Sequence, residues 1–84
     1  MEENLIQYDW LNELEIFETS EIIKNPYSGE EVELLPEAVA VYDLIKGCEL
    51  LLKNQENAYI SKQFYEALDY FKTQWPNEYM ILLD

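Results

Sequence analysis

The chain has 84 residues, 49% of them hydrophobic and 14% aromatic, which excludes a disordered acidic tail and indicates one small domain with a core. Its net charge is −13 and its five cationic residues are all lysines spread along the chain, which argues against direct binding of nucleic acid or an anionic membrane. With no histidine and one cysteine, a structural zinc site and an intrachain disulfide are excluded within one copy.

Residues 1–20 predict an acidic N-terminal helix, because apolar residues recur at intervals of three and four. The alternative is an extended arm, since residues 15–18 alternate between acidic and apolar side chains. The residues that would share the apolar face of the helix are Ile6, Trp10, Leu14 and Phe17.

Residues 21–35 predict a β-hairpin whose strands flank the turn Asn25-Pro26-Tyr27-Ser28-Gly29. Pro26 sets φ for the first turn position, and Gly29 can take a positive φ where the turn closes. Residues 30–34 return with alternating polar and apolar side chains. A two-stranded hairpin is marginal alone, so we expect it to pack on the helices.

Residues 36–84 predict a helical core, which makes residues 1–84 one α+β, mostly helical domain of about three helices and the hairpin. A first helix opens at Pro36 and runs to about Lys53, with Val39 and Leu50 on the side opposite its main apolar face. Gly47 inside it indicates a close helix crossing or a bend.

A second long helix is predicted over residues 56–75, with Phe71 buried where the two long helices cross. Tyr59 and Tyr70 are predicted on one flank of this helix and Tyr65 on the other. After Pro76 we expect a short helical turn and then a packed apolar tail over residues 81–83.

Two segments carry a resemblance. N-P-Y-S-G-E at residues 25–30 precedes P-E-A-V-A-V-Y-D at 36–43, and A-L-D-Y-F at 67–71 precedes Y-M-I-L-L-D at 79–84. Together they resemble small uncharacterised proteins of tailed bacteriophages, which carry an N-P-Y-S/T-G hairpin, a P-E-x-V-A-x-Y-D helix start and a Y-M-x-L-L-D end. The resemblance covers roughly residues 24–84 and implies no activity or site residues. The acidic first 20 residues lie outside it.

The negative charge is concentrated in the first half of the chain. Residues 1–43 hold twelve acids against one lysine, a balance of −11, whereas residues 44–84 hold six acids against four lysines, a balance of −2. Such a field attracts basic protein surfaces. The candidate partner-binding residues are Glu2, Glu3, Asp9, Glu13, Tyr27, Glu30, Glu31 and Glu33. For Tyr27 the alternative is that the motif serves the turn alone.

No pattern in the sequence indicates an enzyme, a cofactor or a metal site. Cys48 has no histidine to activate it and falls on the apolar helix face, so we expect a small core residue. The N-terminus Met-Glu-Glu-Asn lacks a basic region followed by a long apolar run, so we expect a cytoplasmic protein, in the host cytoplasm if it is phage-encoded.

The sequence therefore predicts a non-enzymatic, acidic protein-binding module. The leading hypothesis is a phage accessory protein that binds or inhibits a host protein, and its sharper version is mimicry of nucleic acid in a basic groove. The alternative is a small homo-oligomeric structural or assembly protein that associates through Val39, Leu50 and the flank of Tyr59 and Tyr70.

Overall fold

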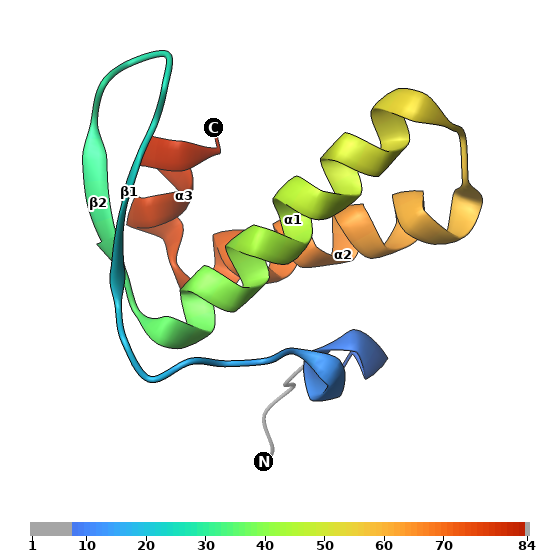
Figure 1. Ribbon diagram of the computed structural model, residues 1–84, viewed down its shortest axis with the longest axis horizontal. Helices are drawn as coiled ribbons and strands as arrows, with labels where there is room; N and C mark the ends of the chain where they lie inside the picture. Colours follow the sequence, from blue (N-terminus) through green and yellow to red (C-terminus); the bar gives the residue numbers. More distant parts are fainter. Residues whose placement is uncertain (1–7, 84) are drawn as a thin grey trace.

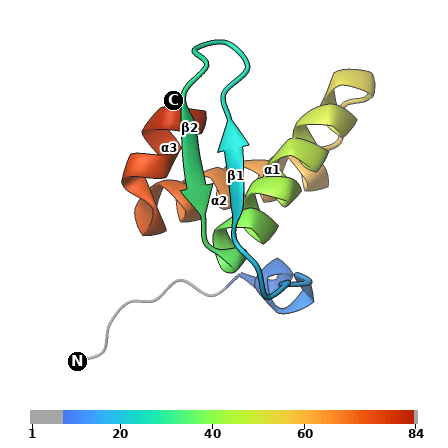
Figure 2. The same ribbon diagram turned by 60° about the vertical axis from the view of Figure 1, so that its left-hand side comes forward.

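The computed structural model describes residues 8–83 as three α-helices and one antiparallel hairpin, the α+β, mostly helical class that the sequence predicts (Figure 1). In chain order the elements are the 3-10 helix η1 (Asp9–Glu13), β1 (Glu21–Lys24), β2 (Glu31–Leu34), α1 (Pro36–Asn54), α2 (Ala58–Gln74) and α3 (Pro76–Leu82). The hairpin and α3 lie together beside the start of α1, and η1 lies near the same end of the helix pair (Figures 1 and 2).

The helices α1 and α2 pack along each other and form the centre of the fold. Pro36 begins α1, where its fixed φ suits the first helical turn. Asn57 begins α2, because its side-chain oxygen accepts the backbone N–H of Ile60 at 3.0 Å. Phe71 is fully buried in the core between them, as predicted. The other large side chains buried to this degree are Leu34, Val41 and Ile45.

The hairpin turn is built around Asn25. Its side-chain oxygen accepts the backbone N–H of Tyr27 at 2.8 Å and that of Ser28 at 3.3 Å, while Gly29 closes the turn with a φ of +82°. The side-chain amide of Asn25 also donates to the carbonyl oxygen of Ile81 at 2.8 Å. The same side chain thus shapes the turn and joins the hairpin to α3.

The predicted helix over residues 1–20 is wrong for the described part of that segment. Helical turns cover only Asp9–Glu13, and residues 14–20 form no helix or strand, which is closer to the alternative of an arm. Phe17, predicted on the apolar face, is 66% exposed. A helix there would place Glu15 and Glu18 three residues apart with no cation in the segment to offset their repulsion.

Two predictions about α1 are also wrong. Val39, predicted to take part in self-association, is only 6% exposed and belongs to the core, since β2 packs against α1 and the helix is buried on more than one side. The close crossing predicted at Gly47 is wrong, since a Cβ added there would meet no atom of residues 8–83 within 4 Å, while the alternative of a bend stays a prediction. Leu50 is exposed as expected. The tail over residues 81–83 is packed as predicted, but α3 continues through Leu82 and makes most of it helical.

Candidate functional site

Trp10 fixes η1 to the helical core. Its side chain is 6% exposed, its ring stacks on Tyr8 with centroids 5.2 Å apart, and it meets the ring of Tyr70 edge-on at 5.9 Å. The indole N–H donates to a carboxylate oxygen of Glu66 at 3.1 Å, across 56 residues of sequence. The acidic arm is therefore held against α2 by a buried aromatic side chain and one polar bond.

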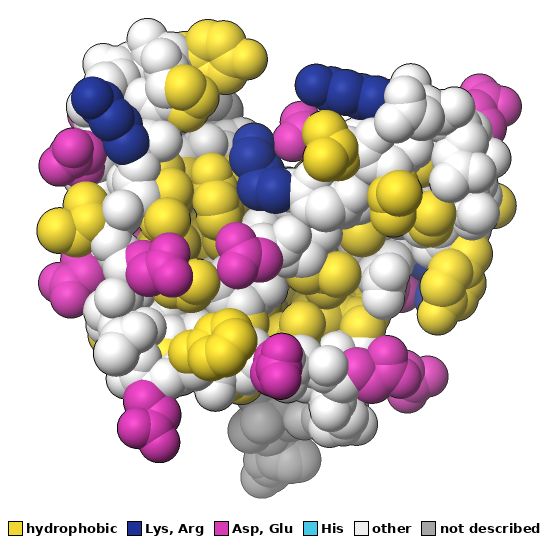
Figure 3. Space-filling view, viewed as in Figure 1, with side chains coloured by type: hydrophobic (Ala, Val, Ile, Leu, Met, Phe, Trp, Pro, Cys, Tyr) yellow, Lys and Arg dark blue, Asp and Glu magenta, His cyan; other side chains and the backbone are white. Residues whose placement is uncertain are grey.

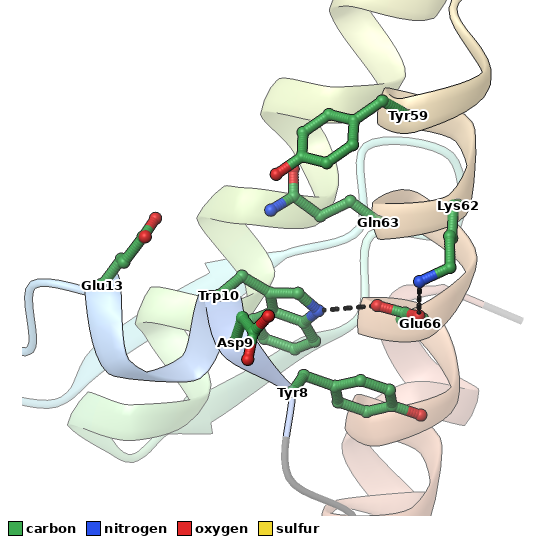
Figure 4. A pocket seen from close by; sticks show the side chains of 8 residues that line it. All are labelled: Tyr8, Asp9, Trp10, Glu13, Tyr59, Lys62, Gln63 and Glu66. Atoms are coloured by element: carbon green, nitrogen blue, oxygen red, sulfur yellow. Dashed lines mark hydrogen bonds and ion pairs between the residues drawn. The ribbon is translucent and has the colours of Figure 1, made fainter.

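A hollow of about 270 Å³ lies between η1 and α2 (Figure 4). The arm contributes one wall, and α2 contributes the other through side chains at the i, i+3, i+4, i+7 spacing of one helix face. The side chains that line the hollow are Tyr8, Asp9, Trp10, Glu13, Tyr59, Lys62, Gln63 and Glu66. It thus combines three aromatic rings, three carboxylates and one ammonium group.

One carboxylate of the hollow is neutralised within it. The ammonium of Lys62 donates to Glu66 at 2.8 Å. This bond is the main reason that the pKa of Glu66 is lowered, and the bond from Trp10 lowers it further, although partial loss of water opposes both. The same bond raises the pKa of Lys62, to which the charge of Asp9 also contributes. Both groups therefore remain charged over a wide range of pH.

The other two carboxylates of the hollow are free of ion pairs. Asp9 and Glu13 are exposed, and neither belongs to an ion pair within residues 8–83. In Figure 4 the Asp9 side chain lies beside the indole of Trp10, and that of Glu13 extends from the far side of η1. The hollow is therefore an aromatic recess with an excess of negative charge, and two of the predicted contact acids form part of it.

The remaining predicted acids lie on the hairpin. Glu30, Glu31 and Glu33 are exposed. The strand register sets Glu31 opposite Lys24 and Glu33 opposite Ile22, so both lie on the face of the hairpin that points away from the core. The turn end of the hairpin and η1 lie at opposite ends of the molecule in both ribbon views (Figures 1 and 2). The structure therefore places the predicted contact acids that it describes in two groups, one on η1 and one on the hairpin. Glu2 and Glu3 lie outside the described residues.

Tyr27 lies at the tip of the hairpin turn with 97% of its surface exposed. The turn uses its backbone N–H but not its ring, because Asn25 and Gly29 supply the turn geometry. Tyr27 therefore presents an accessible aromatic ring on a turn that is tied to α3 through Asn25. The prediction that it contacts a partner is compatible with this position.

The apolar surface expected for self-association is only partly present. Val39 is buried, and Tyr70 is half-buried among the rings of Tyr8, Trp10 and Trp75. Figure 3 shows hydrophobic side chains in several separate patches on this face, with acidic and other polar side chains between them. The large hydrophobic side chains exposed toward the ends of α1 and α2 that meet at residues 55–57 are Leu50, Leu51, Tyr59 and Tyr65.

Sequence reasoning missed the hollow itself. The spacing of Tyr59, Lys62, Gln63 and Glu66 along α2 was a readable sign that they share one face, but nothing local indicated that Trp10 would pack beside it. Among residues 8–83, no three potential ligands converge as they would around a metal ion, and no helix is both long and apolar enough to cross a bilayer.

Comparison with protein-family models, with curated proteins and with solved structures finds no match to this chain. The resemblance to phage proteins over residues 24–84 accordingly stays a prediction.

Proposed function

We propose that the chain is a non-enzymatic protein-binding module that engages a basic surface of another protein. The observation that supports it most is the state of the predicted contact acids. All those within residues 8–83 are exposed, and none is in an ion pair there; they are Asp9, Glu13, Glu30, Glu31 and Glu33. Carboxylates left free in this way act at a distance on a basic partner and speed its association.

The resemblance leads us to propose further that the module is a phage accessory protein, acting on a host protein in the host cytoplasm. Mimicry of nucleic acid would need carboxylates in a continuous row, as phosphates are along a strand. The predicted contact acids within residues 8–83 lie in two groups, on η1 and on the hairpin, and the exposed Glu15, Glu18 and Glu21 lie on the segment that joins them. This arrangement supports a partner with an extended basic surface that reaches both groups.

The test removes charge without touching the core. A variant with Asp9→Asn, Glu13→Gln, Glu30→Gln and Glu31→Gln loses four free carboxylates. The protein is first used to capture a partner from a bacterial lysate at low salt, and association kinetics are then measured with that partner for both forms. We expect the association rate to fall about tenfold or more at low salt, and high salt to produce the same loss in the wild type.

A matched variant controls for net charge alone. It neutralises four acids that lie outside the two groups and belong to no ion pair within residues 8–83: Asp43, Glu56, Asp69 and Glu78. We expect a clearly smaller loss of association rate from this control. If the two variants and the wild type associate alike, without salt dependence, the acids only keep the protein soluble and the proposal fails.

Self-association is the second candidate, and the exposed Leu50 and Tyr65 favour it. Apolar contacts persist in high salt, so a dimer of this kind should remain in sedimentation experiments at high ionic strength. Leu50→Gln should then dissociate it, whereas Leu35→Gln, at an equally exposed leucine at the other end of α1, should not. A monomer at all concentrations would exclude this candidate.

A further inference from the structure

We infer that the hollow between η1 and α2 receives one cationic side chain of the partner, preferentially an arginine. This inference rests on the proposed function and adds to it the place and the chemistry of one contact. It is supported by the combination of a recess, aromatic side chains in its walls, and carboxylates that belong to no ion pair within residues 8–83.

The size of the hollow favours a single side chain. Sites that enclose a whole drug-sized ligand typically measure about 300–1,000 Å³. The hollow measures about 270 Å³ and is open to solvent between the two walls. An occupant attached to a larger body, such as a side chain projecting from a protein surface, fits an opening of this kind better than a free metabolite does.

The walls suit a flat cation. Tyr8, Trp10 and Tyr59 all line the hollow, and Tyr59 is 75% exposed, so its ring is accessible to a ligand. A positive charge is attracted to aromatic rings, and the planar guanidinium of arginine can also lie flat against them. An ammonium group has the charge but not the plane, which is why we place arginine before lysine.

The charges of the hollow select a cation over an anion. Glu66 is neutralised by Lys62, but Asp9 and Glu13 are not paired within residues 8–83. A guanidinium that entered would lie between Asp9 on η1 and the Lys62–Glu66 pair on α2, where Glu66 is turned toward both Lys62 and the indole of Trp10 (Figure 4). Because guanidinium can donate two parallel N–H bonds to one carboxylate, Asp9 is the group that would hold it, and Glu13, which extends from the far side of η1, adds to the negative field.

Lys62 allows a separate test, because its ammonium competes with the incoming cation for the same carboxylates. Lys62 is exposed, and its one bond within the hollow is to Glu66. Lys62→Met would remove this competitor and keep a side chain of similar length. We therefore expect Lys62→Met to tighten binding of an arginine probe by roughly threefold to tenfold.

The probe is the blocked peptide acetyl-Gly-Arg-Gly-amide, compared with the same peptide carrying neutral citrulline. The reporter is the NMR signal of the Trp10 indole N–H, which lies in the hollow and bonds to Glu66. The chain's other tryptophan, Trp75, packs against Phe71 and Tyr70 and does not line the hollow, so its indole signal is an internal control. We expect the arginine peptide to shift the Trp10 signal, and citrulline to leave it in place.

Two double variants of equal charge separate the hollow from the general field. Asp9→Asn with Glu13→Gln should weaken the arginine peptide about tenfold, while Glu31→Gln with Glu33→Gln should weaken it less than twofold. If the variant in η1 does not fold, Tyr59→Leu gives the same test at an exposed position of α2, with an expected loss of about threefold.

Equal losses in the two double variants, an equal response to citrulline, or no movement of the Trp10 signal would each overturn the inference. The association kinetics described above decide the proposed function separately. Suppose that binding of the partner depends on the acids and on salt, but the hollow does not bind the arginine peptide. The proposed function would then stand, and this inference would be wrong.

Discussion

Gly47 lies on the exposed side of α1, and no neighbouring atom of the described residues explains the absence of a side chain there. Glycine inside a helix costs roughly 1 kcal/mol relative to alanine, because the unfolded chain gains more freedom from it. We therefore expect Gly47→Ala to raise the free energy of unfolding by about 0.5–1 kcal/mol, measured by urea denaturation.

Gly29 provides the opposite control. Its φ of +82° is one that residues with a Cβ adopt at a cost of roughly 1–2 kcal/mol. Gly29→Ala should lower the free energy of unfolding by about that amount in the same urea experiment.

The role of Gly29 can be read from the sequence, because the turn motif around it is local. The role of Gly47 cannot, because its surroundings depend on what packs beside α1. A loss of stability in Gly47→Ala would mean that α1 has a close neighbour at this point.

At the scale of the elements, Asn25 couples the hairpin to α3. Asn25→Asp keeps the oxygen that the turn needs but replaces the donor to Ile81 with a carboxylate facing a carbonyl oxygen. We expect a loss of about 1–3 kcal/mol at neutral pH, since the acceptor on Ile81 loses its partner. Below about pH 4 the protonated acid can donate again, so the difference from the wild type should shrink.

The comparison with Asn25→Ala checks this explanation by urea denaturation over the same range of pH. Alanine removes both the donor and the acceptor and does not titrate, so its deficit relative to the wild type should not shrink at acid pH. If Asn25→Asp behaves in the same pH-independent way, the bond to Ile81 contributes little to the coupling between the hairpin and α3.

The contact of η1 with α2 should depend on pH through Glu66. The bond from Lys62 lowers the pKa of Glu66 in the folded protein, so the carboxylate contributes stability above its unfolded pKa of about 4.3. That contribution is lost as the pH falls through the lower folded value. We expect Trp10 fluorescence, measured in a Trp75→Phe background, to change over this acid range before the helices unfold. Glu66→Gln should remove that step and leave only the general acid transition.

The elements that the sequence predicted well are those whose signals are local. The turn around Asn25, the proline at the start of α1 and the apolar periodicity of α2 all lie within a few residues of what they determine. The structure of residues 9–20 depends instead on Trp10 reaching α2 across 56 residues. Apolar periodicity in the sequence does not show whether a helix has a surface to pack against. It therefore predicted a long helix over residues 1–20, whereas helical turns cover only Asp9–Glu13 of the described part.

The candidate site also depends on contacts between residues that are far apart in the sequence. The sequence shows that the predicted contact acids belong to the first half of the chain, but not that the fold separates those of η1 from those of the hairpin. The exposure of the acids could be foreseen from their charge alone. The hollow could not, because half of it comes from a helix about 50 residues further along the chain.

At the scale of the whole molecule, stability depends on one small core. Phe71 is fully buried, and its ring contacts those of Tyr42 and Trp75 at centroid distances of 6.4 and 5.2 Å. Phe71→Ala should lower the free energy of unfolding by about 3–5 kcal/mol. Because total stability is about 0.05–0.15 kcal/mol per residue, or roughly 4–13 kcal/mol for 84 residues, this loss is a large part of it and should lower the melting temperature by many degrees. Circular dichroism during heating measures the effect.

Tyr59→Ala is the matched control, since it truncates an aromatic ring on the same helix that is mostly exposed. Its expected effect on the free energy of unfolding is within about 0.5 kcal/mol. Similar melting curves for the two variants would show that the core is not centred on Phe71.

The irregular segment between η1 and β1, residues 14–20, is where we expect a protease to cut the folded protein. Ile16 and Phe17 are exposed there, outside any helix or strand, which is the situation in which proteases cut folded chains. Tyr27 is more exposed, but its turn is held by bonds to Asn25, which is itself tied to α3, so a chymotrypsin-like enzyme should cleave first after Phe17. That single cut would leave the hairpin and the three helices in one fragment and η1 in another, held to it only by Trp10 and its neighbours. Limited proteolysis thus separates the two walls of the hollow while the core remains folded.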